Sequence, residues 1–308
     1  MLYKLNKNLT KSISLDGVGI SITAELSDAF RTKREGIKSI LKSVNNVYAN
    51  SPKFVVDVES NLLSVEDASE KPYRVASANW AATGWMISKL IKNCIIIDVG
   101  STTTSIIPII NGKIIAKGKT DLEKLQNGEL VYTGSLRTNV ATIINWIPIN
   151  GKITKVSSEL FAQSGDIHMI LDNICENDYI TETSDNRGKT KIESMARLAR
   201  VVCADIEMLT EQQITDMAHF VYDKQVNQIT EGLNQVSKRV RLLTQKKLNL
   251  VVTGLGRIFL AKKAGEKIGY EKIVDMEEYL GEKSAIGSTS VAVALMVASN
   301  LEGKIIKW

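Results

Sequence analysis

Short apolar runs alternate along the chain with longer stretches in which apolar residues recur every three or four positions. The short runs, rich in β-branched residues, predict buried strands, and the longer pattern predicts amphipathic helices. Strands are expected at 18–23, 54–58, 95–97, 105–110, 130–132, 248–253 and 271–276, and helices at 37–47, 77–91, 120–128, 195–209, 210–241, 257–267 and 291–300. This alternation indicates an α/β fold.

The most informative stretch lies at the end of the strand predicted at 95–97. This β-branched run ends at Asp98, and a glycine and four hydroxyl residues follow it, namely Gly100, Ser101, Thr102, Thr103 and Thr104. A glycine lets the backbone approach a ligand closely, and successive N–H groups and hydroxyls can donate to phosphate oxygens. Asp98 can hold a metal ion directly or through water. The stretch therefore predicts a phosphate-binding loop, with an ordinary turn between strands as the alternative.

The residues after this loop indicate which kind of loop it is. In a Walker or Rossmann site the loop opens a helix. Here Pro108 and its β-branched neighbours oppose a helix, and Asn111-Gly112 between apolar runs is a strong hairpin signal. We therefore expect a strand, the loop, a second strand and a third strand that folds back.

Composition limits the classes of partner. The 308 residues allow one large or two medium domains. The net charge of +5 is spread out and aromatic residues make up only 6%, which disfavours nucleic acid and favours a small anionic ligand. No apolar run approaches the roughly 20 residues that span a bilayer, and no signal peptide opens the chain. We expect a cytoplasmic protein without a membrane partner; a homo-oligomer is compatible with the sequence.

The cysteines and histidines give little support to a metal site or a nucleophilic triad. Cys94, Cys175 and Cys203 are far apart, lack metal-ligand spacing and are predicted to be reduced, buried thiols. His168 and His219 are also distant from each other.

Polar residues that could contact a ligand occur near two predicted helix starts. Arg31, Lys33 and Arg34 follow the strand at 18–23, and cations at a helix N-terminus oppose the macrodipole unless an anion lies nearby. A solvated helix start is the alternative. Asn79 and Trp80, at the start of the next helix, could line a pocket, although core packing explains Trp80 equally well.

Two further turns complete the set of candidates. The strand at 130–132 delivers Arg137 to a turn, where it could bind phosphate in a bidentate way or form a structural salt bridge. The strand at 248–253 ends at Thr253 in a glycine-rich turn, with Gly254 and Gly256 ahead of a helix, which is a common site for anions.

These motifs together resemble the actin/sugar-kinase superfamily, whose members have paired ribonuclease-H-like domains with mixed sheets. More narrowly, the chain resembles the hydantoinase A/oxoprolinase family, and within it a short archaeal branch linked to C1 metabolism and methanofuran biosynthesis. The residues that carry the resemblance are at 22–36, 78–83, 98–104, 119–121, 128–134, 136–138, 197–205 and 253–256. The block at 136–138 adds Thr138 to the residues expected to bind substrate.

The resemblance implies a transferase. A furan-methyl diphosphate would lose pyrophosphate while the phenol oxygen of γ-glutamyltyramine attacks the methylene carbon. Mg²⁺ near Asp98, the loop donors and a basic residue would neutralise the leaving group. Glu25 or Asp121 would accept the phenol proton.

The resemblance also implies two domains, at 1–92 and 93–308. Relatives open with an Asp-x-Gly-Gly-type loop that nothing before Val18 matches. An N-terminal domain without its first hairpin is therefore expected, which would expose a sheet edge.

Two other functions stay open. The first is an ATP-dependent amidohydrolase of the hydantoinase/oxoprolinase kind, for which ATP is the cofactor. The second is a non-catalytic nucleotide-binding protein.

Overall fold

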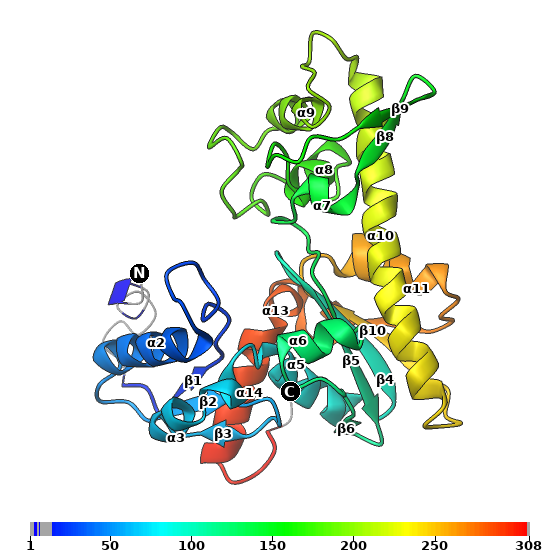
Figure 1. Cartoon of the computed structure of the whole chain (residues 1–308). Coiled ribbons are helices and arrows are strands. Elements are labelled where there is room, and N and C mark those ends of the chain that lie inside the picture. The colour runs from blue at the N-terminus through cyan, green and yellow to red at the C-terminus, as the bar shows by residue number, and fades with distance from the viewer. Residues whose placement is uncertain (1–2, 5, 7–13, 307–308) are drawn as a thin grey trace.

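The computed structural model describes residues 3, 4, 6 and 14–306. A mixed sheet at the centre of the molecule carries the predicted phosphate loop (Figure 1). Its strands are β4 (Cys94–Val99), β5 (Thr104–Ile110), β6 (Lys113–Ile114), β7 (Leu130–Val131), β10 (Asn249–Thr253) and β11 (Ile273–Asp275). The order β11-β10-β4-β5-β6 is parallel from β11 to β4 and antiparallel from β4 to β6, and β7 pairs with β5.

This arrangement confirms the predicted hairpin and the mixed α/β class. The turn between β5 and β6 consists of Asn111 and Gly112, both with positive φ, as the Asn-Gly pair predicts. A meander of three antiparallel strands, extended by parallel strands on its other side, is the sheet of a ribonuclease-H-like domain.

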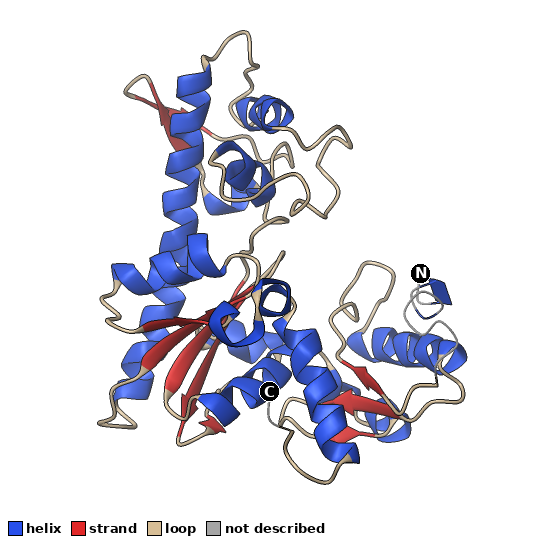
Figure 2. Ribbon diagram, turned by 180° about the vertical axis from the view of Figure 1, so that it is seen from behind, coloured by secondary structure: helices blue, strands red, loops and turns tan. Residues whose placement is uncertain are grey.

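The alternation of side chains along β4 explains why helices cover both faces of the sheet. Cys94 and Ile96 belong to one hydrophobic cluster, whereas Ile95 and Ile97 belong to another. The first cluster packs under α5 (Asn79–Leu90) and α14 (Ser288–Leu301), and the second under α10 (Glu211–Arg241), the π-helical turn η1 (Arg257–Lys262) and α11 (Lys263–Lys267). Figure 2 shows the sheet between these helices.

The N-terminal part has its own small sheet and its own cluster of buried residues. Its strands are β1 (Val18–Ile20), β2 (Lys53–Val56) and β3 (Leu62–Leu63), and its helices are α2 (Lys33–Val47), α3 (Val65–Glu70) and α4 (Pro72–Val75). Strand β1 is parallel to β2, and β2 is antiparallel to β3. Helix α14 packs so closely on β1 that a Cβ at Gly19 would lie 2.4 Å from Val293. The predicted division between 92 and 93 stays a prediction.

A further group of elements extends from the central sheet (Figure 1). It comprises α7 (Val140–Ile143), β8 (Trp146–Ile149), β9 (Lys152–Lys155), α8 (Ser164–Ile170) and α9 (Lys191–Arg200). Helix α10 begins with a capping box formed by Thr210 and Gln213. Ile214 to Val221 on this helix pack in the extension, and Val226 to Val240 pack on the central sheet, so one helix joins the two.

Several predictions about individual elements were wrong. The helix expected through 209 ends at Arg200, Cys203 adopts a φ of +59°, and Ile206 is exposed. Asp205 therefore lies outside a helix, where its carboxylate accepts hydrogen bonds from the N–H groups of Glu207 and Met208.

The thiols and the last helix also differ from expectation. All the cysteines are free, but only Cys94 is buried, whereas Cys175 and Cys203 are exposed. The last helix, expected at 291–300, begins earlier, because α14 spans Ser288–Leu301, and it follows α12 (Glu277–Leu280) and α13 (Glu282–Ile286).

Candidate active site

The predicted phosphate loop connects β4 to β5, and the turn beside it fixes its shape. The N–H of Ser135 donates to the carbonyl of Gly100, and the N–H groups of Leu136 and Arg137 both donate to the carbonyl of Ser101. Gly134 makes this contact feasible, because a Cβ there would lie 2.6 Å from the backbone of Thr102. The carbonyls of the loop are thus occupied before any ligand binds.

The N–H groups of the loop remain available. Within the described part of the chain, those of Ser101, Thr102 and Thr103 make no hydrogen bond, whereas that of Gly100 donates to the Thr103 carbonyl. Successive free N–H groups are suited to an anion. Thr104 differs from its neighbours, since it is buried and its hydroxyl donates to the carbonyl of Thr133.

The loop forms one wall of a cleft of about 720 Å³ between the N-terminal part and the central sheet. The opposite wall is the segment that follows β1, and α6 (Asp121–Gln126) and the start of α5 contribute the rest. The lining includes half of the predicted site residues: Glu25, Asn79, Trp80, Gly100, Ser101, Thr102, Thr103, Asp121 and Arg137. It also includes Lys124, which the sequence did not suggest.

Four side chains from distant parts of the chain meet in this cleft. The hydroxyl of Ser77 lies 2.6 Å from Glu25 Oε1 and 2.7 Å from Asp121 Oδ2, so its one proton can serve only one carboxylate at a time. Lys33 Nζ lies 2.5 Å from Asp121 Oδ2 and 3.8 Å from Glu25 Oε1. Gly36 allows α2 to approach this segment, because a Cβ there would lie 2.5 Å from the Glu25 carbonyl. Both predicted base candidates are therefore placed together.

Glu25 has an unusual environment for a carboxylate. Its side chain is 1% exposed, and Oε2 makes no hydrogen bond to any described residue. A buried acceptor without a partner is costly, so this oxygen is suited to receive a donor from a ligand.

Lys124 is the corresponding unpartnered cation. The residue is 1% exposed, Nζ makes no hydrogen bond to the described residues, and it lies 3.7 Å from the centre of the Trp80 ring. Burial lowers the pKa of Lys124 to about 7, although Glu129, Asp121 and Asp98 act in the opposite direction. Trp80 is itself almost fully buried, with Lys124 over its ring.

Asp98 lies at the end of β4, beside the cleft rather than in its lining. Burial raises the pKa of Asp98 to about 6, and hydrogen bonds from Thr83 and Ser288 and the charge of Lys124 oppose this shift. The Thr83 hydroxyl lies 3.3 Å from Asp98 Oδ2.

The predicted glycine turn packs against Asp98 and does not line the cleft. Gly254 has a φ of +86°, and a Cβ there would lie 2.7 Å from Asp98 Oδ1. The Thr253 hydroxyl donates to the Ala285 carbonyl, and a Cβ at Gly256 would lie 2.5 Å from Val99. In the structure these residues support the end of β4.

The remaining predicted residues are outside the cleft or on its rim. Arg31 is exposed and its N–H donates to Glu35, and Arg34 lies over the ring of Tyr73. Arg137 is exposed on the rim. Thr138 is buried, and its hydroxyl accepts a hydrogen bond from the N–H of Gly134.

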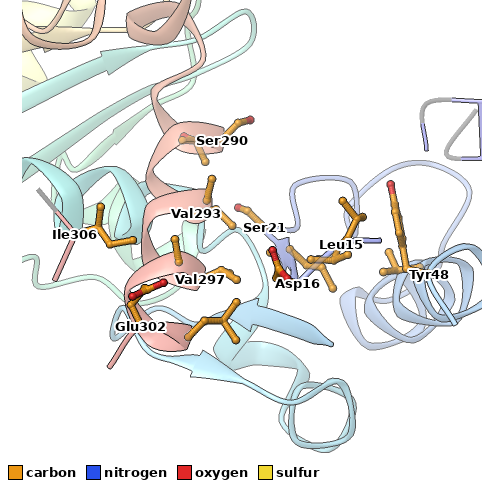
Figure 3. Close-up of a pocket in the computed structure, with 18 of the residues that line it drawn as sticks. Leu15, Asp16, Ser21, Tyr48, Ser290, Val293, Val297, Glu302 and Ile306 are labelled. Atoms are coloured by element: carbon orange, nitrogen blue, oxygen red, sulfur yellow. The ribbon is translucent and has the colours of Figure 1, made fainter. Parts of the chain in front are cut away.

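A larger groove, of about 1180 Å³, lies between α2, β1 and α14 (Figure 3). Its walls are mainly apolar, with Val293 and Val297 on α14 and Tyr48 beside α2. Asp16 and Glu302 are its charged residues, and neither the loop nor Glu25 reaches it. The smaller cleft is therefore the better candidate for chemistry.

The described residues contain no group of three or more His, Cys, Asp or Glu side chains that could hold a metal ion. With a single carboxylate such as Asp98 beside the cleft, Mg²⁺ fits only when substrate phosphates and water supply most of its ligands, which is a common arrangement for this ion. In the same part of the chain, no helix is long and apolar enough to cross a membrane.

The sheet topology and the loop between β4 and β5 define a protein of the ribonuclease-H-like class. Residues 16–299 match the family model described as Hydantoinase/oxoprolinase, and the chain belongs to this family. A solved structure of nucleotide-free acetone carboxylase, from a study of ATP-dependent acetone carboxylation, superposes with a TM-score of 0.53 at 10% identity. It covers 85% of this chain, and the chain spans only 38% of that protein, so this similarity concerns the fold alone.

Two relatives are much more similar. One, from Methanocaldococcus jannaschii, is 38% identical over 98% of this chain and 88% of its own length. The other, from Methanococcus vannielii, is 38% identical over 70% of this chain and 95% of its own length. Both are named (4-{4-[2-(gamma-L-glutamylamino)ethyl]phenoxymethyl}furan-2-yl)methanamine synthase.

Proposed function

We propose that this protein is an enzyme of the same kind as these two relatives and forms the ether between a phenol and a furan-methyl carbon. The substrates would be a furan-methyl diphosphate and γ-glutamyltyramine, and the second product would be pyrophosphate. The observation that carries the proposal is the 38% identity to a named synthase over 98% of the chain. The printed name of that relative describes a product with a phenoxymethyl group on a furan ring, and this group contains the ether bond of the proposed reaction.

The cleft offers what such a reaction requires of a diphosphate site. Diphosphate leaves readily only when its negative charge is stabilised in the transition state. The free N–H groups of Ser101, Thr102 and Thr103 and the guanidinium of Arg137 would supply donors around it. Mg²⁺ bound to the diphosphate oxygens, with Asp98 as a ligand through water, would neutralise part of the charge.

The same cleft offers a base for the phenol. A phenol has a pKa near 10 and is a weak nucleophile until its proton is accepted. Glu25 Oε2 is buried and unpartnered, and we assign it as the acceptor, with Ser77 and Lys33 in contact with its other oxygen.

The test is a reconstitution with defined substrates. The purified protein, Mg²⁺, the furan-methyl diphosphate and γ-glutamyltyramine are expected to give the ether and an equal amount of pyrophosphate, measured by mass spectrometry and a coupled phosphate assay. Glu25→Gln should reduce the rate about 10²-fold or more, whereas Glu59→Gln, on an exposed residue, should not. Absence of the ether in the wild type would refute the proposal.

The family description favours a second candidate, an ATP-dependent hydrolase of the hydantoinase/oxoprolinase type. This enzyme would use the loop for ATP and phosphorylate a lactam oxygen. ATP hydrolysis stimulated by hydantoin or 5-oxoproline would support it, and ether formation without ATP would exclude a need for nucleotide. Binding of nucleotide with neither activity would instead indicate a non-catalytic protein.

A further inference from the structure

Lys124 is a charged group for which the described structure supplies no partner. It lies on the short helix α6, and it is among the largest fully buried side chains of the molecule. Gly118 lets the preceding segment pack directly on it, because a Cβ there would lie 2.5 Å from the Lys124 backbone N. The fold thus places the Lys124 side chain in the wall of the cleft, almost completely buried.

Two of the three acids near Lys124 are engaged by other groups, and the third, Asp98, accepts a hydrogen bond from Thr83 and forms no ion pair with Lys124. Glu129 accepts hydrogen bonds from the N–H groups of Lys117 and Gly118 and from Arg239. Asp121 is paired with Lys33. No ion pair joins Lys124 to any described residue, and Nζ has no hydrogen-bond acceptor among them. Burial of an ammonium without a partner is costly, so its retention requires an explanation.

Trp80 accounts for part of that explanation but not for all of it. A ring face attracts an ammonium, and the 3.7 Å separation fits such a contact. A ring accepts no conventional hydrogen bond, however, and the three N–H donors of the ammonium remain unused. Lys124 lines the same cleft as Ser101, Thr102 and Thr103, whose N–H groups are also unused. Donors from two walls therefore converge on one space, which is the arrangement expected of an anion site.

We propose that Lys124 is a catalytic residue that binds an oxygen of the diphosphate and stabilises the negative charge that develops as pyrophosphate leaves. This inference rests on the proposed function. The bond between the furan methylene carbon and the diphosphate oxygen breaks, and its electron pair goes to that oxygen. The phenol oxygen forms the new carbon–oxygen bond, and its proton goes to Glu25. Lys124 remains an ammonium throughout, so no proton is unaccounted for.

The experiment compares two variants at this position with a matched control. Lys124→Met removes the charge and keeps much of the stem, and Lys124→Arg restores a cation. Lys119→Met is the control, because Lys119 is exposed, precedes the same helix and pairs only with Glu59 at the surface. Circular dichroism and melting temperature establish that each variant is folded. Binding of Mg²⁺ with pyrophosphate is measured by calorimetry, and ether formation is measured separately.

Lys124→Met is expected to weaken pyrophosphate binding about 10- to 100-fold, as the loss of a charged hydrogen bond does. It should lower kcat about 10²-fold. Lys124→Arg should recover part of the binding, and Lys119→Met should match the wild type. Unchanged pyrophosphate affinity in folded Lys124→Met, or a wild type that does not bind pyrophosphate, would overturn the inference.

The two proposals can fail separately. A wild type that binds pyrophosphate through Lys124 but makes no ether would refute the proposed function and leave the anion site in place. A wild type that makes the ether, together with a Lys124→Met variant that keeps its kcat and its pyrophosphate affinity, would support the proposed function and refute the role of Lys124.

Discussion

Lys33 and Asp121 are 88 positions apart in the chain, yet their side chains meet at 2.5 Å and connect α2 to the first residue of α6. Each side chain is less than a third exposed. Asp121 lines the cleft together with Glu25, so the contact links the N-terminal part of the chain to the central sheet at the site itself.

Lys33→Met should therefore destabilise the protein by about 1 kcal/mol, because Asp121 and Glu25 then share the Ser77 hydroxyl without a cation. Urea unfolding of Lys33→Met, Asp121→Asn and the double variant gives the coupling energy between the two residues. Lys38→Met, on the exposed side of α2, is the control and should be neutral within about 0.5 kcal/mol. A coupling energy of zero would show that the contact is not formed in solution.

Lys124 predicts an unusual dependence of stability on pH. Its pKa of about 7 in the folded protein is below the ordinary lysine value of 10.5, because burial makes the ammonium less favourable than it is in the unfolded chain. The contribution of this residue is most favourable above pH 10.5 and is lost as pH falls from 10.5 to about 7. At pH 7, Lys124→Met should raise the free energy of unfolding by on the order of 2 kcal/mol. At pH 10.5 the increase in the free energy of unfolding should be smaller. Chemical denaturation of the wild type and Lys124→Met at pH 7 and at pH 10.5 measures this difference.

A variant more stable than the wild type and yet inactive would be a strong sign that Lys124 is retained for function. A Lys124→Met protein that is less stable at pH 7 would instead show that the contact with Trp80 outweighs the cost of burial.

Gly100, in the loop between β4 and β5, and Gly134, in the turn that holds this loop, should respond differently to alanine. At Gly100 a Cβ would meet only the Thr103 carbonyl, at 3.7 Å, whereas at Gly134 it would lie 2.6 Å from the backbone of Thr102. Gly100→Ala should keep the stability within about 0.5 kcal/mol and weaken pyrophosphate binding, because the added methyl occupies ligand space. Gly134→Ala should lose about 1–3 kcal/mol of stability as well as binding.

Gly188→Ala serves as the control for both glycine variants, because the nearest atom to its Cβ would be at 3.7 Å on a flexible side chain. Thermal melting and calorimetry distinguish the two effects. Equal pyrophosphate affinity in Gly100→Ala and the wild type would show that the loop backbone does not approach the phosphate.

Ligand-dependent thermal stabilisation separates the two candidate reactions. At about 100 times its dissociation constant, a ligand adds roughly 2.7 kcal/mol to the free energy of unfolding. Magnesium with pyrophosphate should raise the melting temperature, and magnesium with ATP should have a smaller effect. Asp98→Asn should remove this rise in melting temperature. Without ligand, the same variant should be more stable than the wild type at pH 7, because burial disfavours the ionised form of Asp98 and raises its pKa to about 6. A shift with ATP alone would favour the hydrolase.

Local sequence patterns predicted the frame of the molecule and much less of its site. The β-branched run from Ile95 to Ile97 and the Asn111-Gly112 pair indicated the hairpin, because their effects act over a few residues. The apolar spacing from Met195 to Leu209 favoured one long helix, but the positive φ of Cys203 breaks it, and that turn depends on tertiary contacts.

The arrangement of the site depends on contacts between distant residues. The sequence suggested Glu25, Lys33 and Asp121 separately, without indicating that they meet through Ser77. Lys124 was missed because a lysine on a short polar helix is normally exposed, and only the folded structure shows that α6 turns it towards Trp80.

The turn that holds the carbonyls of Gly100 and Ser101 has a kinetic consequence. A loop that is already ordered needs no rearrangement to accept a diphosphate, and it offers the same donors to the pyrophosphate that is released. The product should therefore compete with the substrate and slow each new cycle. The net flux through such an enzyme would depend on how quickly another activity in the cell hydrolyses pyrophosphate.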